Sequence, residues 1–127
     1  MNILAVETST ERCSVSLATA TSEIENHVIA PKGQATLVIK MAEEMLKQCD
    51  LQKSDLNAIA FGSGPGSFNG IRVAASFAHG VAMAQNIDIV PCSTLHALAM
   101  TPNLTASQNV LVISDARQNE VYWSGVR

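Results

Sequence analysis

The chain has 127 residues, 47% of them hydrophobic, which is enough for one domain with a substantial core and too little for two full domains. Its 8 Lys and Arg stand against 11 Asp and Glu, and the basic residues are scattered, so direct RNA binding by this chain alone is not expected. Cys13, Cys49 and Cys92 are odd in number and lack a C-x-x-C spacing, so they fit neither a disulfide framework nor a zinc site.

The first residues of the chain argue against a secretion signal. They carry no basic region, and Glu7 stands where a signal peptide would still be apolar. No later apolar run approaches the ~20 residues that span a bilayer. Together with the cysteine pattern, these features predict a soluble, cytoplasmic protein with no membrane partner.

Apolar residues that alternate with polar ones predict three strands at the start of the chain, over residues 3–6, 13–17 and 23–29. The first two are expected to form a hairpin. After the breaker Pro31-Lys32-Gly33 the period becomes helical, and this helix is expected to cover one side of the sheet. Its predicted core face consists of Ala35, Val38, Ile39, Ala42, Met45, Leu46 and Cys49.

Helices and strands alternate in the next part of the chain. Residues 56–61 predict a buried strand, residues 62–70 a glycine-rich loop, and residues 71–85 a second helix. Residues 87–90 predict another strand, after which Ser93 could cap a short helix. This order of elements is typical of an α/β lobe of the ribonuclease-H-like, actin-like (ASKHA) class, with a mixed sheet and helices.

The end of the chain forms a separate unit in this interpretation. Residues 1–104 are predicted to be the actin-like N-terminal lobe, and two further strands lie on either side of residues 115–119. Because a lone hairpin is marginally stable, residues 105–127 are predicted to be the first hairpin of a second lobe that is cut short. Asp115 and Arg117 could pair with one another or with a partner.

The glycine-rich loop is a candidate for anion binding. It lies between a strand and a helix, where backbone N–H groups and the helix dipole can hold a phosphate, and Gly64, Gly66 and Ser67 are the candidate contacts. It is not a P-loop, because no lysine follows and Pro65 removes a donor. The alternative is a tight turn that needs a positive φ at glycine.

Glu7, Thr8 and Ser9 follow the first strand, where actin-like folds place a carboxylate and hydroxyls against the phosphates and magnesium of a nucleotide. Glu7 could hold a metal-bound water there. The alternative is a polar hairpin turn whose hydroxyls bond to nearby backbone groups. If the first interpretation holds, the chain could be a lobe of an actin-like ATPase or a small-molecule kinase.

Other catalytic chemistry has little support in the sequence. The three histidines form no H-E-x-x-H or H-x-x-x-H pair, so no protein-bound metal and no zinc peptidase are predicted. No G-x-S-x-G motif is present for a serine hydrolase. Cys92 and His96 could act as a nucleophile and its base, but a cysteine in a Pro-Cys-Ser sequence at the start of a helix is more often an inert thiol. No catalytic residue is predicted.

The second helix is apolar almost all round, with a narrow polar strip of Arg72, Ser76 and His79. Such a helix must be covered on both sides, so a second protein layer is expected opposite its own sheet. That layer could be a partner or a later segment of the same chain. The predicted partner interface consists of Leu37, Met41, Val73, Phe77, Gly80 and Ala84.

Several blocks of the sequence, in order over the whole chain, resemble one known family, the TsaB (YeaZ) family. The most specific are Gly64-Pro65-Gly66-Ser67-Phe68 and Asp115-Ala116-Arg117 with Val121-Tyr122-Trp123. The others are Ile3-Leu4-Ala5-Val6-Glu7-Thr8-Ser9-Thr10, Cys13-Ser14-Val15-Ser16-Leu17 and Ser93-Thr94-Leu95.

The resemblance implies a non-catalytic scaffold subunit that pairs with the catalytic subunit TsaD, with the ATPase TsaE joining, in synthesis of N6-threonylcarbamoyladenosine at tRNA position 37. It implies a two-lobed actin-like fold, and a homodimer through the two helices when TsaD is absent. The label glycoprotease-like attaches to these families, but the missing metal ligands argue against that activity here. The catalytic subunit holds a metal with histidines, and this sequence lacks the corresponding pair. No cofactor is expected on this chain alone, although ATP and Mg²⁺ could bind in the complex.

Overall fold

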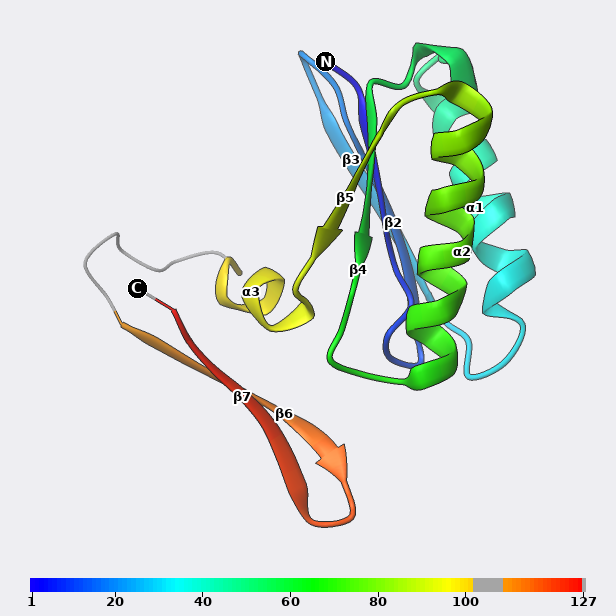
Figure 1. Ribbon diagram of the computed structural model, residues 1–127. Coiled ribbons are helices and arrows are strands. Elements are labelled where there is room, and N and C mark those ends of the chain that lie inside the picture. Colours follow the sequence, from blue (N-terminus) through cyan, green and yellow to red (C-terminus); the bar gives the residue numbers. More distant parts are fainter. Residues whose placement is uncertain (102–108, 127) are drawn as a thin grey trace.

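The structure is a computed structural model that describes residues 1–101 and 109–126 (Figure 1). The predicted domain boundary at residue 104 therefore lies outside the described residues. In chain order the elements are β1 (Ile3–Glu7), β2 (Arg12–Ala18), β3 (Glu23–Ile29), α1 (Gln34–Gln48), the short 3-10 helix η1 (Lys53–Asp55), β4 (Ala58–Gly62), α2 (Phe68–Gln85), β5 (Asp88–Cys92), α3 (Thr94–Ala99), β6 (Val110–Arg117) and β7 (Glu120–Val126).

The first five strands form one mixed sheet in the order β3-β2-β1-β4-β5. β1 and β2 are antiparallel, as are β2 and β3, whereas β4 runs parallel to both β1 and β5. Side chains alternate between the two faces along each strand, so that Leu4 and Val6 of β1 are buried while their neighbours are half-buried. The predicted mixed sheet with helices is confirmed.

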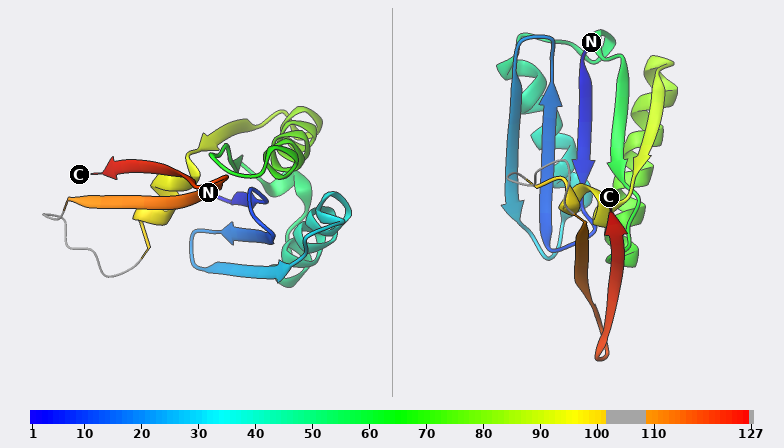
Figure 2. Two further views of the ribbon diagram at one scale, coloured as in Figure 1. Left: turned by 90° about the horizontal axis from the view of Figure 1, so that it is seen from below. Right: turned by 90° about the vertical axis from the view of Figure 1, so that its left-hand side faces the viewer.

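Helices α1 and α2 lie side by side on the same face of this sheet (Figures 1 and 2). Each one buries a single stripe of residues spaced three or four apart, which is the spacing of one helix face. In α1 the stripe is Val38, Met41, Ala42, Met45 and Leu46. In α2 it is Gly70, Ala74, Ala78 and Ala82, whose small side chains let the helix lie close to the sheet.

The orientation of α1 differs from the prediction at two residues. Met41 is only 3% exposed and lies in the core, whereas Ile39, predicted to face the core, is 46% exposed. Met41 completes the buried three-and-four spacing with Val38 and Met45, and Ile39 falls beside that stripe. The prediction that Met41 belongs to a partner surface is therefore wrong.

The three cysteines are free thiols in different surroundings. Cys13 lies on the inner face of β2 and is fully buried, and this burial raises the pKa of its thiol. Cys92, in contrast, is exposed at the end of β5. Its Sγ contacts the carbonyl oxygen of Val90, which gives no support to a nucleophilic pair with His96.

Strands β6 and β7 form a separate antiparallel hairpin that packs on α3 through Leu95, Ala99 and Val112 (Figure 1). β6 is longer than predicted, since only Gln118 and Asn119 lie between the strands. The carboxylate of Asp115 accepts the backbone N–H of Arg117 at 2.7 Å, so this contact supports the turn. The outer face exposes Leu111, Ile113, Val121 and Trp123.

Within residues 1–101 and 109–126, no helix is both long enough and apolar enough to pass through a membrane.

Candidate functional site

Two segments that were predicted to contact a nucleotide meet at one end of the sheet, where the inner strands β1 and β4 finish. Glu7 is the last residue of β1, Thr8 and Ser9 follow it, and the loop with Gly64, Gly66 and Ser67 follows β4. Because β1 and β4 are parallel neighbours, their carboxyl ends lie together. The backbone N–H of Ser67 donates to the carbonyl oxygen of Ser9 at 2.6 Å, which joins the two segments directly.

The carboxylate of Glu7 is engaged within the chain on both of its oxygens. Oε1 accepts the backbone N–H of Ser9 at 2.6 Å, and Oε2 accepts the hydroxyl of Thr94 at 2.9 Å. Gly62 lies against the same carboxylate, and a Cβ on this glycine would overlap it. Glu7 therefore links β1, β4 and the start of α3.

The hydroxyls of Thr8 and Ser9 also point into the protein. Thr8 is fully buried and donates to the carbonyl oxygen of Gly70 at 2.6 Å, and the Ser9 hydroxyl lies 3.4 Å from that of Thr94. This is the arrangement expected if such hydroxyls satisfy nearby polar groups of the fold. In this geometry neither hydroxyl is turned toward a ligand.

The glycine-rich loop is a tight turn that starts α2. Gly64 has φ +93°, a conformation that favours glycine, and its carbonyl oxygen accepts the backbone N–H of Thr94. The Ser67 hydroxyl caps α2 by accepting the N–H of Gly70 at 3.3 Å. The six residues predicted to contact a nucleotide thus lie close together. The hydrogen bonds described above are made within this group and to Gly70 and Thr94.

Potential metal ligands do not cluster at this end of the sheet or elsewhere in the described part of the chain. There, no group of three or more His, Cys, Asp or Glu side chains is placed to hold a metal ion. Glu7 is the one carboxylate among the six candidate residues. It makes hydrogen bonds to two protein donors, so the geometry favours a structural role for it.

Replacing Thr94 by valine tests that structural role. The change keeps the shape of the side chain but removes the donor to Oε2 of Glu7. We expect the free energy of unfolding to fall by about 2 kcal/mol, because a hydrogen bond to a charged group is lost. Urea denaturation followed by circular dichroism measures this, and Thr10→Val, which alters an exposed hydroxyl, should change stability much less.

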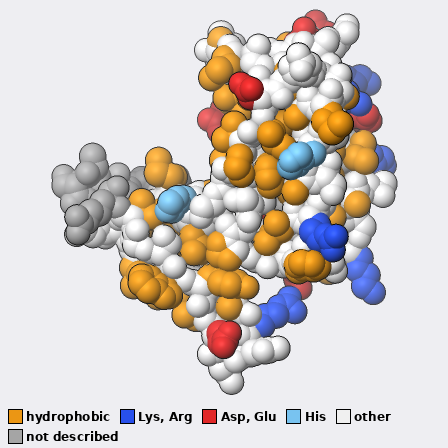
Figure 3. All heavy atoms as spheres, in the orientation of Figure 1, with side chains coloured by type: hydrophobic (Ala, Val, Ile, Leu, Met, Phe, Trp, Pro, Cys, Tyr) orange, Lys and Arg blue, Asp and Glu red, His pale blue; other side chains and the backbone are white. Residues whose placement is uncertain are grey.

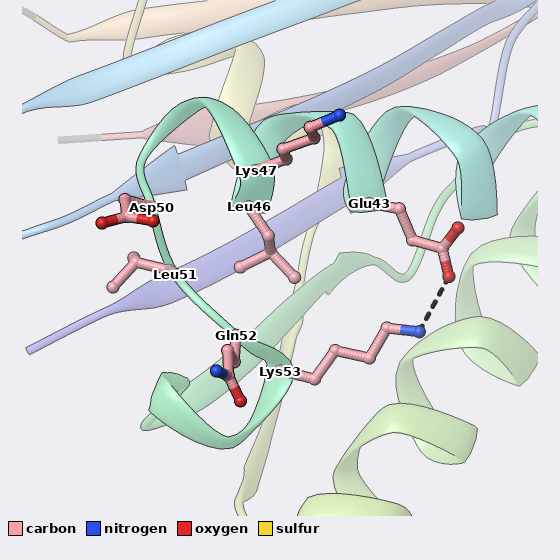
Figure 4. A pocket seen from close by; sticks show the side chains of 7 residues that line it. All are labelled: Glu43, Leu46, Lys47, Asp50, Leu51, Gln52 and Lys53. Carbon is pink, nitrogen blue, oxygen red and sulfur yellow. Dashed lines mark hydrogen bonds and ion pairs between the residues drawn. The ribbon is translucent and has the colours of Figure 1, made fainter.

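A small hollow lies at the C-terminal end of α1 (Figure 4). Its volume is about 350 Å³, and an ion pair of 2.8 Å joins Lys53 to Glu43 across one side. Both side chains are about half exposed, so the pair contributes at most ~1 kcal/mol. These lining residues do not form a recognisable catalytic group. They are Glu43, Leu46, Lys47, Asp50, Leu51, Gln52 and Lys53.

A larger groove, of about 630 Å³, lies between the N-terminal halves of α1 and α2. Hydrophobic side chains are spread over the face that carries α2 (Figure 3). The groove is lined by Ala35, Val38, Ile39, Asn69, Arg72, Val73, Ser76 and Phe77. Most of this lining is apolar, and Ile39 in particular remains 46% exposed.

The structure divides the residues of the predicted partner interface. Val73 and Phe77 line the groove and are half-buried against the core, whereas Leu37 packs on the core but is not part of the groove lining. Gly80 and Ala84 are exposed further along α2 and lie outside the groove lining. Ile39, which was predicted to face the core, lines the groove instead.

Comparison with known proteins gives consistent matches over nearly the whole chain. A family model described as TsaD, tRNA N6-adenosine threonylcarbamoyltransferase, matches residues 26–127. The tRNA threonylcarbamoyladenosine biosynthesis protein TsaB of Haemophilus influenzae is 38% identical over 99% of this chain and 54% of its own length. The protein of the same name from Escherichia coli is 34% identical over 98% of this chain and 54% of its own length.

Solved structures agree with these matches. YeaZ from Pseudomonas aeruginosa superimposes with a TM-score of 0.85 at 32% identity, covering 98% of this chain and 59% of that one. The chain thus spans about half the length of the curated relatives it matches.

Proposed function

Because the chain belongs to the TsaB (YeaZ) family, we propose that it is a non-catalytic partner subunit of a TsaD-type threonylcarbamoyltransferase in tRNA threonylcarbamoyladenosine biosynthesis. The observation that carries this proposal is the apolar groove between α1 and α2. Apolar surface gathered in a groove between two helices is typical of a protein interface. The TsaD-type subunit is the partner that we propose for it.

The hydrogen bonds of Glu7 support the non-catalytic part of the proposal. In an ATPase or kinase of the actin-like class, a carboxylate at this position would face magnesium. Here Ser9 and Thr94 donate to its two oxygens, and the neighbouring hydroxyls are buried. We therefore propose that the chain binds no nucleotide alone, and that ATP and Mg²⁺ bind only in the assembled complex.

The remaining partners follow from the same proposal. The groove could hold a second copy of the chain when the TsaD-type subunit is absent, and a TsaE-type ATPase would join the complex of the two subunits. We further propose that the β6–β7 hairpin is the start of a second lobe, since its outer face exposes large apolar side chains. Three free thiols suit a reducing cytoplasm as the place of assembly.

Co-purification with a TsaD-type subunit from the same organism tests the proposed function. We expect a stable complex that sediments as one species, and no heat of binding when Mg-ATP is titrated into this chain alone. Failure to form a complex would count against the scaffold function. Stoichiometric Mg-ATP binding with turnover by this chain would favour the ATPase or kinase function instead.

A further inference from the structure

Arg72 is the one ionisable side chain among the residues that line the α1–α2 groove in the described part of the chain. Its guanidinium carbon lies 5.1 Å from the centre of the Phe68 ring, and Phe68 is itself 72% exposed. A cation over an aromatic face is held in place but keeps its charge. The contact therefore presents a positive group at an apolar surface.

No carboxylate neutralises Arg72 within the described residues. The ion pair found there joins Lys53 to Glu43, at the other end of α1. Residues 102–108 contain no Asp or Glu. The charge of Arg72 is thus available to a group from another molecule.

The two helices that border the groove add to its positive potential. Ala35 and Asn69, which line the groove, lie in the first turns of α1 and α2, where the helix dipoles are positive. Neither α1 nor α2 has an acidic residue in its first turn, and Gly33 gives α1 no side-chain cap.

We propose that the segment which fills this groove is a helix of the partner that carries an Asp or Glu opposite Arg72, with apolar side chains against Ile39 and Phe77. This inference rests on the proposed function and specifies the chemistry of the partner surface. A guanidinium covered by an apolar partner alone would lose water without gaining a counter-ion, which is costly. A carboxylate offsets that cost and can accept two N–H groups from the guanidinium.

The same charges favour a different protein over a second copy of this chain. If two copies met through their grooves, each would bring an arginine and two positive helix ends to the shared surface. Like charges brought together in this way are unfavourable, and they suppress the wrong partner. Arg72 would thus make the groove bind an acidic helix of a different protein in preference to a second copy of this chain.

Binding of Arg72 variants to the TsaD-type subunit tests the inference. By calorimetry or sedimentation we expect Arg72→Met to weaken binding by about 30-fold or more, because truncating one member of a covered charge pair is costly. Arg72→Lys should recover part of the affinity, since it keeps the charge and loses the two-pronged geometry. Lys47→Glu, an exposed residue in the last turn of α1, is the control and should bind within about twofold of the wild type.

Salt provides a second readout. Raising NaCl from about 50 to about 300 mM should weaken wild-type binding more than that of Arg72→Met, because screening acts on the charge that the variant lacks. Binding of Arg72→Met with wild-type affinity and wild-type salt dependence would overturn the inference. If in that case Ile39→Glu still abolished binding, the proposed function would stand without it. A wild-type chain that failed to bind would overturn both.

Discussion

Gly70→Ala is expected to lower the free energy of unfolding by about 3 kcal/mol, the upper range for inserting a methyl group into a well-packed site. A Cβ at Gly70 would overlap the backbone carbonyl oxygen of Thr8. This oxygen cannot move aside easily, because Thr8 is fully buried and its hydroxyl donates to the carbonyl of Gly70. Urea denaturation followed by circular dichroism measures the change.

Gly80→Ala is the matched control on the same helix. Gly80 is exposed, and a Cβ there would meet no other atom within 4 Å. Since alanine favours a helix over glycine, the control should gain up to about 1 kcal/mol. If the two variants lost stability equally, the contact between α2 and Thr8 would not be what requires glycine at residue 70.

The order and type of most elements could be predicted because they depend on local patterns. The third strand was predicted over residues 23–29 and is observed as Glu23–Ile29. Ser93 was expected to cap a short helix, and its hydroxyl accepts the N–H of His96 at 3.4 Å. α2 begins at Phe68, three residues before the prediction, because Ser67 caps it inside the glycine-rich loop.

The face of a helix that turns to the sheet was harder to predict. α1 has apolar residues at so many positions that a helical wheel gives more than one acceptable core face. Contact with β2 and α2 decides between them, and it buries Met41 and leaves Ile39 in the groove. Such contacts join residues far apart in the chain, so they cannot be inferred from a local sequence pattern.

The candidate site shows the same limit. The meeting of residues 7–9 with the glycine-rich loop could be anticipated, because both follow strands of one sheet. Thr94, which donates to Glu7 across 87 positions of sequence, was not anticipated. Its position two residues after the end of β5, the neighbour of β4, was the available signal. Because the hydrogen bond from Thr94 was not predicted, Glu7 was interpreted as a carboxylate that could face a nucleotide.

Phe77→Glu is expected to abolish association with the TsaD-type subunit and to turn any homodimer into a monomer. Phe77 lines the groove, and an ionised carboxylate covered there without a partner costs about 3–5 kcal/mol, or at least a hundredfold in affinity. Sedimentation velocity measures both effects. Because Phe77 also packs on the core, its variant could lose stability as well, so a second variant is needed.

Ile39→Glu separates the interface from the fold. Ile39 lines the same groove from α1, but it is 46% exposed, so a glutamate there can reach water in the free chain. It should therefore unfold close to the wild-type denaturant concentration and still fail to bind, because docking would cover the new charge. Met83→Glu, at an 82% exposed position of α2 outside the groove lining, should bind normally. Normal binding by Ile39→Glu would mean that the partner contacts another face, and loss of binding by Met83→Glu would extend the interface along α2.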